Sequence, residues 1–315
     1  MNKRHFLKRL SHSVVSRIIG ACALFFIGGV GAPAAFAELK VATLHPLMTD
    51  VAKKVGGSHV SVVSLMNPGE DIHHFSPTSS DMAKARASDV VIASGKGLEL
   101  YLPKLKASLP STTLVVEAGN ACRSVKLSSK DAIFACCPQH AAGSIDPHWW
   151  HSISGMRAAA EYVAKEFGKA DPAHKDAYRA NAKAWGRDLK ALESWAKREV
   201  SKIPRSRRYL VTAHAAFGYF CKEFGFKSIP VAGTAEEAVS SQYLTEAIEA
   251  VKENGVTTVF PEKNASAKAL DAICSATGAR KGTSLIADGS SSRATSYEAF
   301  VQHNIQAVVS GLGGA

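Results

Sequence analysis

The sequence offers little that would hold the chain in a membrane or on nucleic acid. Beyond residue 37 it contains no run of about 18 or more apolar residues, so we expect the mature chain to be soluble. Its basic residues are scattered among acidic ones, and the short cluster Arg205, Arg207 and Arg208 is typical of a solvated loop. These features argue against a membrane-spanning protein and against a nucleic-acid partner.

Two motifs of enzyme chemistry are also missing or incomplete. The sequence has no HExxH arrangement of the kind found in zinc proteases. Ser94-Gly95-Lys96-Gly97 lacks the other residues of a phosphate-binding loop, so it predicts a strand-to-helix turn. Neither motif supports an enzyme.

The long apolar run that the sequence does have lies at the N-terminus. Five basic residues precede or enter it, and it ends at Ala35-Phe36-Ala37, which predicts a signal peptide over residues 1–37 and a periplasmic protein starting at Glu38. Cleavage would remove five positive charges from a formal net charge of +11, leaving 11 − 5 = +6. A lipoprotein cut at Cys22 is the alternative, but it would leave most of the apolar run on the mature chain.

The mature part is long enough for two domains that each bury a core. Short β-branched runs alternate with amphipathic segments, which is the pattern of parallel βα units. The predicted strands lie at 39–44, 59–65, 89–94 and 112–117, and again at 208–213, 226–231, 256–260 and 282–288. We therefore predict two similar α/β lobes, at 38–171 and 204–315, each with a four-stranded, mostly parallel sheet flanked by helices.

A single long helix is predicted between the lobes, over 172–203. Asp171 and Pro172 form a start signal, because a capping carboxylate precedes proline at the first helical position. Apolar residues then recur at helical spacing as far as Val200. Two shorter helices broken near Gly186 are the alternative, since an internal glycine costs roughly 1 kcal/mol. One stiff helix would restrict the lobes to small tilts.

Three histidines and one aspartate follow predicted strands, where ligands bind in open α/β sheets. They are His73, His148, His214 and Asp288. Two facing lobes would bring these groups to one cleft. Three imidazoles and a carboxylate make a four-coordinate set, which Zn²⁺ prefers.

Two of these histidines have an aspartate two residues before them. Asp71 and Asp146 would each accept a hydrogen bond from the non-coordinating ring nitrogen of His73 and His148. Alternatively, both aspartates cap turns next to prolines and glycine. The sequence leaves both interpretations open.

Several motifs, in order, resemble the zinc and manganese solute-binding proteins of bacterial ABC importers, the cluster A-I metal-binding family. They are GEDIHHFSPTSSDM, ASDVVIASGKGLELYL, DPHWW, VTAHAAFGYF, VTTVFPE, LIADG and SYEAFVQHN. The resemblance spans the mature chain and implies two α/β lobes, one linking helix and a metal site in the cleft. It also implies a monomeric receptor that hands its ion to a membrane permease.

Within that family the ligands fall on the positions of His73, His148, His214 and Asp288. Manganese members tend to carry glutamate at the third position, so His214 points to zinc as the transported ligand. The resemblance therefore implies a high-affinity periplasmic zinc receptor and not an enzyme, with an ABC permease and a periplasmic zinc chaperone as partners. A manganese or mixed-metal receptor, and a zinc-scavenging or adhesion protein without a permease, are the alternatives.

This sequence departs from the family pattern in two places. Ile72 stands where proline is common, and His74 beside His73 offers a second candidate ligand. Adjacent side chains in an extended segment point apart, which favours His73 alone. A long histidine-rich loop is also missing, because the segment before the DPHWW motif contains only His140.

That segment instead contains cysteines. An oxidising compartment favours a disulfide from Cys122 to Cys136 or Cys137, which would stabilise the loop by roughly 3 kcal/mol. A free cysteine that collects metal with His140 is the alternative. The pairing of Cys221 and Cys274 stays open. Of the six cysteines, five remain after the predicted cleavage, and this odd number leaves at least one unpaired.

Two further histidines lie near the predicted site. His45 ends the first strand, and we expect an outer role or a surface position for it, not ligation. His151 receives no function from its sequence position. A secreted zinc hydrolase with Asp288 as base is the enzymatic alternative, and the absence of an HExxH motif argues against it.

Overall fold

The computed structural model describes residues 37–67, 69–127, 144–232, 241–263, 267–289 and 294–313. The first sheet contains strands β1 (Leu39–Thr43), β2 (Val60–Ser64), β3 (Val90–Ala93) and β4 (Leu114–Glu117). All are parallel, in the order β2-β1-β3-β4. Each predicted strand of this lobe is present within one or two residues of its expected bounds.

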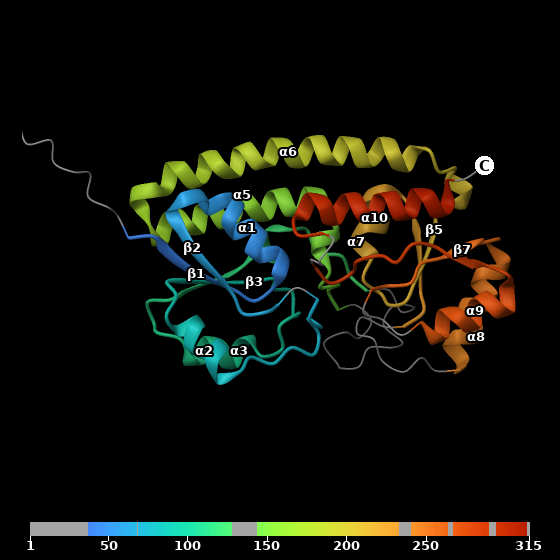
Figure 1. Cartoon of the computed structure of the whole chain (residues 1–315), viewed down its shortest axis with the longest axis horizontal. Helices are drawn as coiled ribbons and strands as arrows, with labels where there is room; N and C mark the ends of the chain where they lie inside the picture. Colours follow the sequence, from blue (N-terminus) through green and yellow to red (C-terminus); the bar gives the residue numbers. More distant parts are fainter. Residues whose placement is uncertain are drawn as a thin grey trace, which may run out of the picture. The chain divides into compact units, whose positions relative to one another are not determined.

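Successive residues of these strands point to opposite layers, as the period of two requires. Val41 and Ile92 pack in the core with α1 (Pro46–Gly56) and α5 (Ile153–Ala170). Ala42 and Val91 pack in a second cluster with α2 (Ser79–Arg86) and α3 (Leu102–Ser108). The sheet is therefore covered on both faces (Figure 1), which explains its almost continuously apolar strands.

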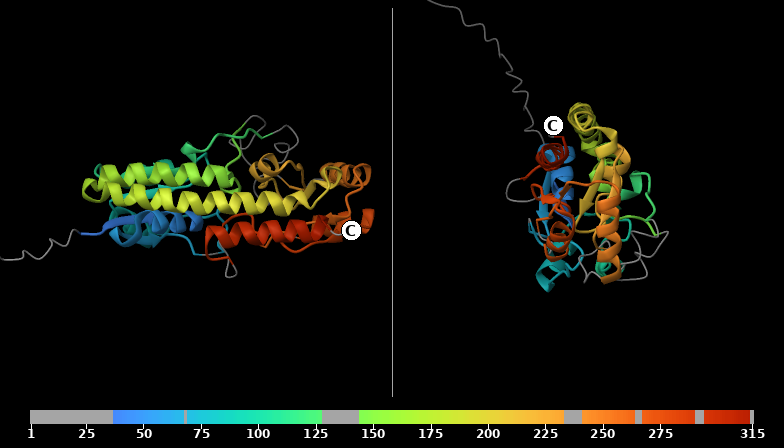
Figure 2. Two further views of the ribbon diagram at one scale, coloured as in Figure 1. Left: turned by 90° about the horizontal axis from the view of Figure 1, so that it is seen from above. Right: turned by 90° about the vertical axis from the view of Figure 1, so that its right-hand side faces the viewer.

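The predicted long helix is continuous. Helix α6 (Lys175–Ser201) runs for 27 residues, or about 40 Å, through Gly186 without a break. It begins later than predicted because Pro172–His174 form a 3-10 turn, and it ends before Pro204. Seen from above, α6 runs between α5 on one side and α1 and α10 (Tyr297–Leu312) on the other (Figure 2), and it packs against all three.

The second lobe is also parallel, but its strands are shorter. Strands β5 (Tyr209–Thr212) and β6 (Lys227–Pro230) form one pair, and β7 (Thr258–Val259) and β8 (Arg280–Lys281) another. A bridge from Thr212 to Phe260 joins the pairs, giving the order β6-β5-β7-β8. The fourth strand was predicted too late, since 282–288 contribute only a bridge at Leu285. The predicted fold class, two α/β lobes with a long helix, is the fold observed.

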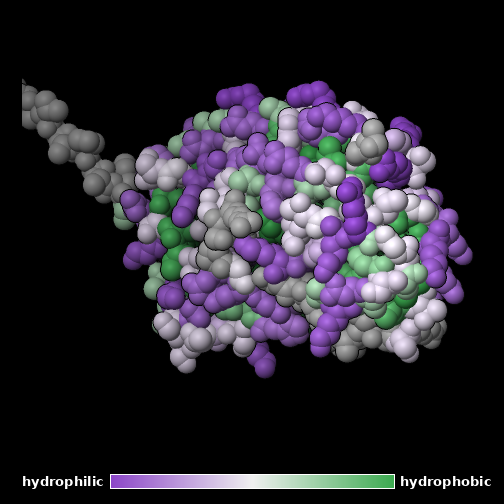
Figure 3. Space-filling model, turned by 45° about the vertical axis from the view of Figure 1, so that its right-hand side comes forward, coloured by the Kyte–Doolittle hydropathy of each residue, from purple (hydrophilic) through white to green (hydrophobic). Residues whose placement is uncertain are grey.

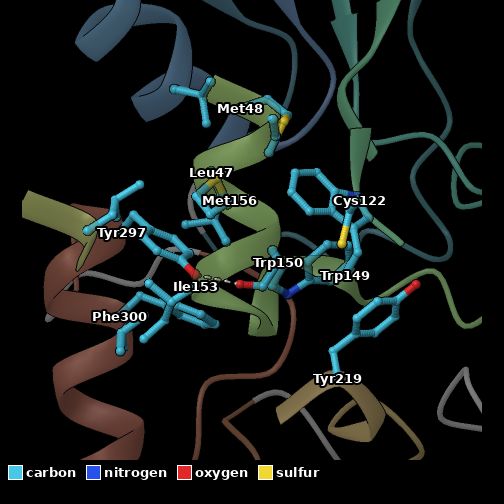
Figure 4. Packing of buried hydrophobic residues seen from close by; sticks show 14 of the residues in the cluster. Leu47, Met48, Cys122, Trp149, Trp150, Ile153, Met156, Tyr219, Tyr297 and Phe300 are labelled. Atoms are coloured by element: carbon cyan, nitrogen blue, oxygen red, sulfur yellow. Dashed lines mark hydrogen bonds between the residues drawn. The ribbon is translucent and has the colours of Figure 1, made fainter. Parts of the chain in front are cut away.

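Three further helices flank the second sheet: α7 (Gly218–Phe224), α8 (Ser241–Glu253) and α9 (Lys268–Thr277). Val211, Val231 and Val259 pack with α8 and α9 in a core cluster of their own. Helix α5, by contrast, was not predicted from the sequence. It supplies Ile153 and Met156 to the same core cluster that contains Trp149 and Trp150 (Figure 4).

The surface is mainly polar on the face shown in Figure 3, with only small hydrophobic areas between hydrophilic side chains. Leu100 and Ile145 are the large hydrophobic residues that are exposed in the described part of the chain. Within the same ranges, no helix combines the length and the apolar character needed to cross a membrane.

Candidate metal centre

The four predicted residues lie in loops that follow strands of both sheets. His73 belongs to a turn after β2, and His148 precedes the 3-10 turn Trp149–His151. His214 comes directly after β5, and Asp288 follows the bridge at Leu285. His214 thus stands at the carboxyl end of β5, the edge where ligands bind in open parallel sheets, and the other three side chains reach the site from longer loops.

The structure brings these four side chains together. Their ligand atoms all lie within 4.8 Å of one another. The Oδ1 atom of Asp288 is 3.7 Å from Nε2 of His73, 3.7 Å from Nε2 of His148 and 3.6 Å from Nε2 of His214. The Nε2 atoms of His73 and His148 are 3.2 Å apart. Three ring nitrogens and one carboxylate oxygen therefore converge on a single point.

Two of these atoms have no hydrogen bond of their own. His214 Nε2 and Asp288 Oδ1 are buried and lack a hydrogen-bond partner among the described residues. A buried polar atom left in this state costs about 1–3 kcal/mol. A cation at the point of convergence would satisfy both atoms at once, which is why the arrangement fits a metal better than a structural hydrogen-bond network.

A carboxylate orients His148 from within the same loop. Asp146 Oδ1 accepts from the backbone N–H of His148 at 2.9 Å and lies 2.8 Å from its ring Nδ1. Because Nδ1 faces this carboxylate, Nε2 is turned toward the centre. The hydrogen bond expected from the spacing of Asp146 and His148 is therefore present.

A second carboxylate orients His214 in the same way, and sequence reasoning missed it. Glu262 accepts from the backbone N–H of His214 at 3.0 Å through Oε1, and its Oε2 forms a short hydrogen bond with the ring Nδ1. Glu262 follows β7, the strand beside β5, so the pairing of these strands creates the contact. An acid at the end of a neighbouring strand, in VTTVFPE, was the available sequence signal.

The corresponding hypothesis for Asp71 and His73 is wrong. Asp71 accepts from the backbone N–H groups of His73 and His74, and its Oδ2 pairs with the ring of His74 at 2.7 Å. It caps a turn, because the tight backbone there presents N–H groups rather than the His73 ring. The His74 side chain is 60% exposed, whereas that of His73 is 5% exposed and faces the cluster.

Charges within the cluster shift two pKa values in opposite directions. Burial by itself lowers the pKa of His214, but the carboxylates of Glu262 and Asp288 overcome this and hold it well above the usual value. Burial would raise the pKa of Asp288, yet His214 and His73 hold it well below its usual range. A proton on His214 and a negative Asp288 thus stabilise each other when no metal is bound.

Two neighbours of His148 hold the segment that carries Asp288. The indole Nε1 of Trp150 donates to the carbonyl of Ala287 at 2.8 Å, and Nε2 of His151 lies 2.9 Å from the same oxygen. Burial lowers the pKa of His151 to about 3, so its ring is neutral and donates through Nε2. His151, which had no function from sequence, therefore fixes the backbone next to Asp288.

The two tryptophans have different contacts. The centroids of the Trp150 and His148 rings are 5.2 Å apart, and the rings meet edge to face. The backbone carbonyl of Trp150 accepts a hydrogen bond from the hydroxyl of Tyr297 at 2.9 Å (Figure 4). Trp149 instead donates to Ser94, at the turn after β3. Trp150 thus packs against the imidazole of His148, and Trp149 anchors the loop to the first sheet.

The cysteine predictions fall largely outside the described residues. Cys136, Cys137 and His140 lie there, so the predicted disulfide of Cys122 stays a prediction. Cys122 is buried against Gly155 of α5, and burial raises the pKa of its thiol. Cys221 is buried on α7 and Cys274 half-buried on α9.

Comparison with known proteins gives a consistent result. The family model described as "ZnuA: Zinc-uptake complex component A periplasmic" matches residues 41–311. The chain is 32% identical to the manganese-binding lipoprotein MntA of Bacillus subtilis, over 87% of this chain and 90% of MntA. It is 29% identical to the iron-binding protein YfeA of Yersinia pestis, over 88% of this chain and 87% of YfeA.

Solved structures show the same fold. The periplasmic zinc-binding protein TroA from Treponema pallidum superposes with a TM-score of 0.77 at 23% identity, covering 88% of this chain and all of TroA. The family match and the curated relatives identify the chain as a metal-binding substrate-binding protein of the kind that serves ABC transporters, a class of receptors and not of enzymes. The chain belongs to the ZnuA family, whose members act with a permease and an ATPase.

Proposed function

We propose that the chain is a periplasmic receptor that binds Zn²⁺ through His73, His148, His214 and Asp288 and delivers it to an ABC importer. The observation that carries this proposal is the convergence of four ligand atoms within 4.8 Å, two of them buried without a hydrogen bond among the described residues. The signal peptide predicted over residues 1–37 and the family's periplasmic description support the location.

The choice of zinc rests on the chemistry of the donors. Three imidazole nitrogens and one carboxylate oxygen form the closed, four-coordinate set that Zn²⁺ prefers. Mn²⁺ favours more oxygen ligands. The carboxylates of Asp146 and Glu262 contact Nδ1 of their histidines and leave Nε2 to the metal, which strengthens each imidazole as a ligand.

Manganese is the second candidate, because the relative with 32% identity is named as manganese-binding. Competitive titration of the mature protein, starting at Glu38, with Zn²⁺ and Mn²⁺ separates the two candidates. We expect one tight zinc site and weaker manganese binding. A manganese preference would overturn the choice of metal and leave the site in place.

The adjacent histidines provide a matched test of the site. His73→Ala should weaken zinc binding by more than the 10- to 100-fold that is typical of losing an outer hydrogen-bond partner, whereas His74→Ala should leave it unchanged. His148→Ala and His214→Ala should behave like His73→Ala. Wild-type zinc affinity in all three of these variants would refute the site.

Delivery to a permease is a separate part of the proposal. Deletion of the chain in its host should abolish zinc uptake at low external zinc, and the His148→Ala variant should fail to restore it. Normal uptake without the chain would favour a scavenging protein that has no cognate permease.

A further inference from the structure

His45 is a buried histidine that the proposed ligand set does not use. It lies between β1 and α1 and is fully buried. Its Nδ1 atom accepts a hydrogen bond from the backbone N–H of Leu47 at 3.0 Å, and the residue has the extended backbone of a helix N-cap. One end of the imidazole therefore has a defined structural role.

The Nε2 end of the His45 ring has no such structural role. A ring nitrogen that accepts a hydrogen bond is unprotonated, so the His45 ring, whose Nδ1 accepts from Leu47, is neutral. Because Nδ1 accepts a hydrogen bond, the single ring proton must sit on Nε2. That Nε2–H is buried and has no acceptor among the described residues. A fixed donor is thus left without an acceptor.

The surroundings of this donor point to the metal centre. The His45 ring lies 4.6 Å from the ring of Trp150, which in turn contacts His148. A Cβ atom added to Gly289 would lie 3.3 Å from Cε1 of His45, the ring atom next to Nε2. Gly289 follows Asp288 directly, so His45 stands against the backbone that carries the carboxylate.

We propose that His45 donates its Nε2 hydrogen to the carboxylate of Asp288 when the metal is bound, and thereby holds this carboxylate as a one-oxygen ligand. The inference rests on the proposed metal site. A protonated Nε2 cannot itself coordinate a cation, which leaves the number of protein ligands at four. Asp288 then has an orienting partner, as His148 has Asp146 and His214 has Glu262.

This donor would also affect metal choice. A carboxylate that accepts a hydrogen bond on one oxygen is less able to give both oxygens to the metal. The site then stays at three nitrogens and one oxygen, which favours Zn²⁺ over an ion that seeks more oxygen ligands. His45 is thus a positioning residue with an expected effect on selectivity.

Two substitutions separate this role from the helix cap. His45→Asn retains a side-chain oxygen that caps α1 but lacks the distant donor. His45→Phe retains ring packing on Trp150 but lacks both donor and cap. We expect both to lower zinc affinity about 10-fold or more and to narrow the preference for zinc over manganese, with His74→Asn as the unchanged control.

Histidine ¹⁵N NMR of the folded wild-type protein supplies a readout that a merely structural role would not move. The metal-free protein should show His45 with its proton on Nε2, and zinc should shift that N–H resonance downfield. A proton on Nδ1, or a resonance that zinc leaves in place, overturns the inference.

The titrations distinguish this inference from the proposed site. Wild-type affinity and selectivity in both His45 variants, with binding abolished by His148→Ala, overturn the role of His45 and leave the site intact. Wild-type affinity in His148→Ala overturns the site and with it the role of His45.

Discussion

The two lobes orient their buried histidines with the same chemistry over very different distances along the chain. In the first lobe Asp146 and His148 are two residues apart, whereas in the second lobe His214 and Glu262 are 48 residues apart. In both, the carboxylate binds the backbone N–H and the ring Nδ1 of its histidine. The pair Asp146 and His148 is thus formed within a local turn. The pair Glu262 and His214 forms because two neighbouring strands bring the residues together.

This difference makes the second half depend on its sheet. β7 has only two residues in regular pairing, and a single bridge from Thr212 to Phe260 joins it to β5. The hydroxyl of Thr212 also donates to the carbonyl of His214 at 2.9 Å. A shift of β7 against β5 would therefore separate Glu262 from His214, whereas Asp146 and His148 would remain together.

Among substitutions that test this comparison of the two lobes, removal of an orienting carboxylate should cause the largest loss of zinc affinity. Asp146→Asn and Glu262→Gln should each lower zinc affinity about 10- to 100-fold, because the imidazole loses its fixed orientation and part of its basicity. Asp71→Asn is the matched control, since the asparagine oxygen can still accept from the turn. Isothermal titration measures all three, and an equal loss in Asp71→Asn would contradict the distinction between caps and orienting partners.

Proton competition should give a pH dependence governed by the second lobe. The raised pKa of His214 means that zinc must displace its proton, so affinity should rise about tenfold per pH unit until the pH passes that pKa. Titrations in buffers of different ionisation enthalpy should show about one proton released near pH 7. Glu262→Gln should reduce this release, because His214 loses a carboxylate neighbour, and Asp146→Asn should change it less.

The pKa shifts of His214 and Asp288 also make the stability of the metal-free protein depend on pH. His214 has a raised folded-state pKa, so its contribution is present at lower pH and is lost as pH rises through that value. Asp288 has a lowered pKa, so its contribution is lost as pH falls through it. The ion pair should therefore stabilise the metal-free protein between these two pKa values, as thermal unfolding against pH would show. A zinc affinity independent of pH between 6 and 8 would contradict the protonated His214.

A smaller loss of zinc affinity is expected when a side chain of the second lobe displaces the carboxylate that orients His148. A Cβ atom added at Gly218, the first residue of α7, would lie 2.4 Å from Oδ2 of Asp146. Gly218→Ala should therefore displace the carboxylate that orients His148, destabilise the fold by about 1–3 kcal/mol and weaken zinc binding. Denaturant unfolding and titration measure the two effects. Unchanged binding would mean that Asp146 can move without turning His148.

The smallest expected effect is a gain in the stability of the folded protein, caused by a substitution in the linking helix α6. A Cβ atom added at Gly186 would make only ordinary contacts with Arg157, at 3.6 and 3.8 Å. Gly186→Ala should raise the stability of the folded protein by about 0.5–1 kcal/mol, because alanine loses less backbone freedom in a helix. It also serves as the matched control for Gly218→Ala. A loss of stability would indicate that α6 bends at this residue.

Much of this arrangement could be predicted from particular residues. The β-branched runs predicted all four strands of the first sheet, because buried parallel strands are apolar on both faces. Asp171, Pro172 and the apolar spacing that ends at Val200 predicted one long helix. The second lobe was harder, since β7 and β8 have only two residues each and leave almost no periodic pattern.

Sequence by itself determined which side chains stand at the ends of strands, and so the three imidazoles and the carboxylate that meet in the centre. It also determined the pairing of Asp146 with His148, because two residues of chain bring them together. Only the tertiary structure decided the roles of Glu262, His45 and His151. Each acts on a group from 48 to more than 200 residues away in the chain, and no local pattern records which strand end or carbonyl will lie beside it.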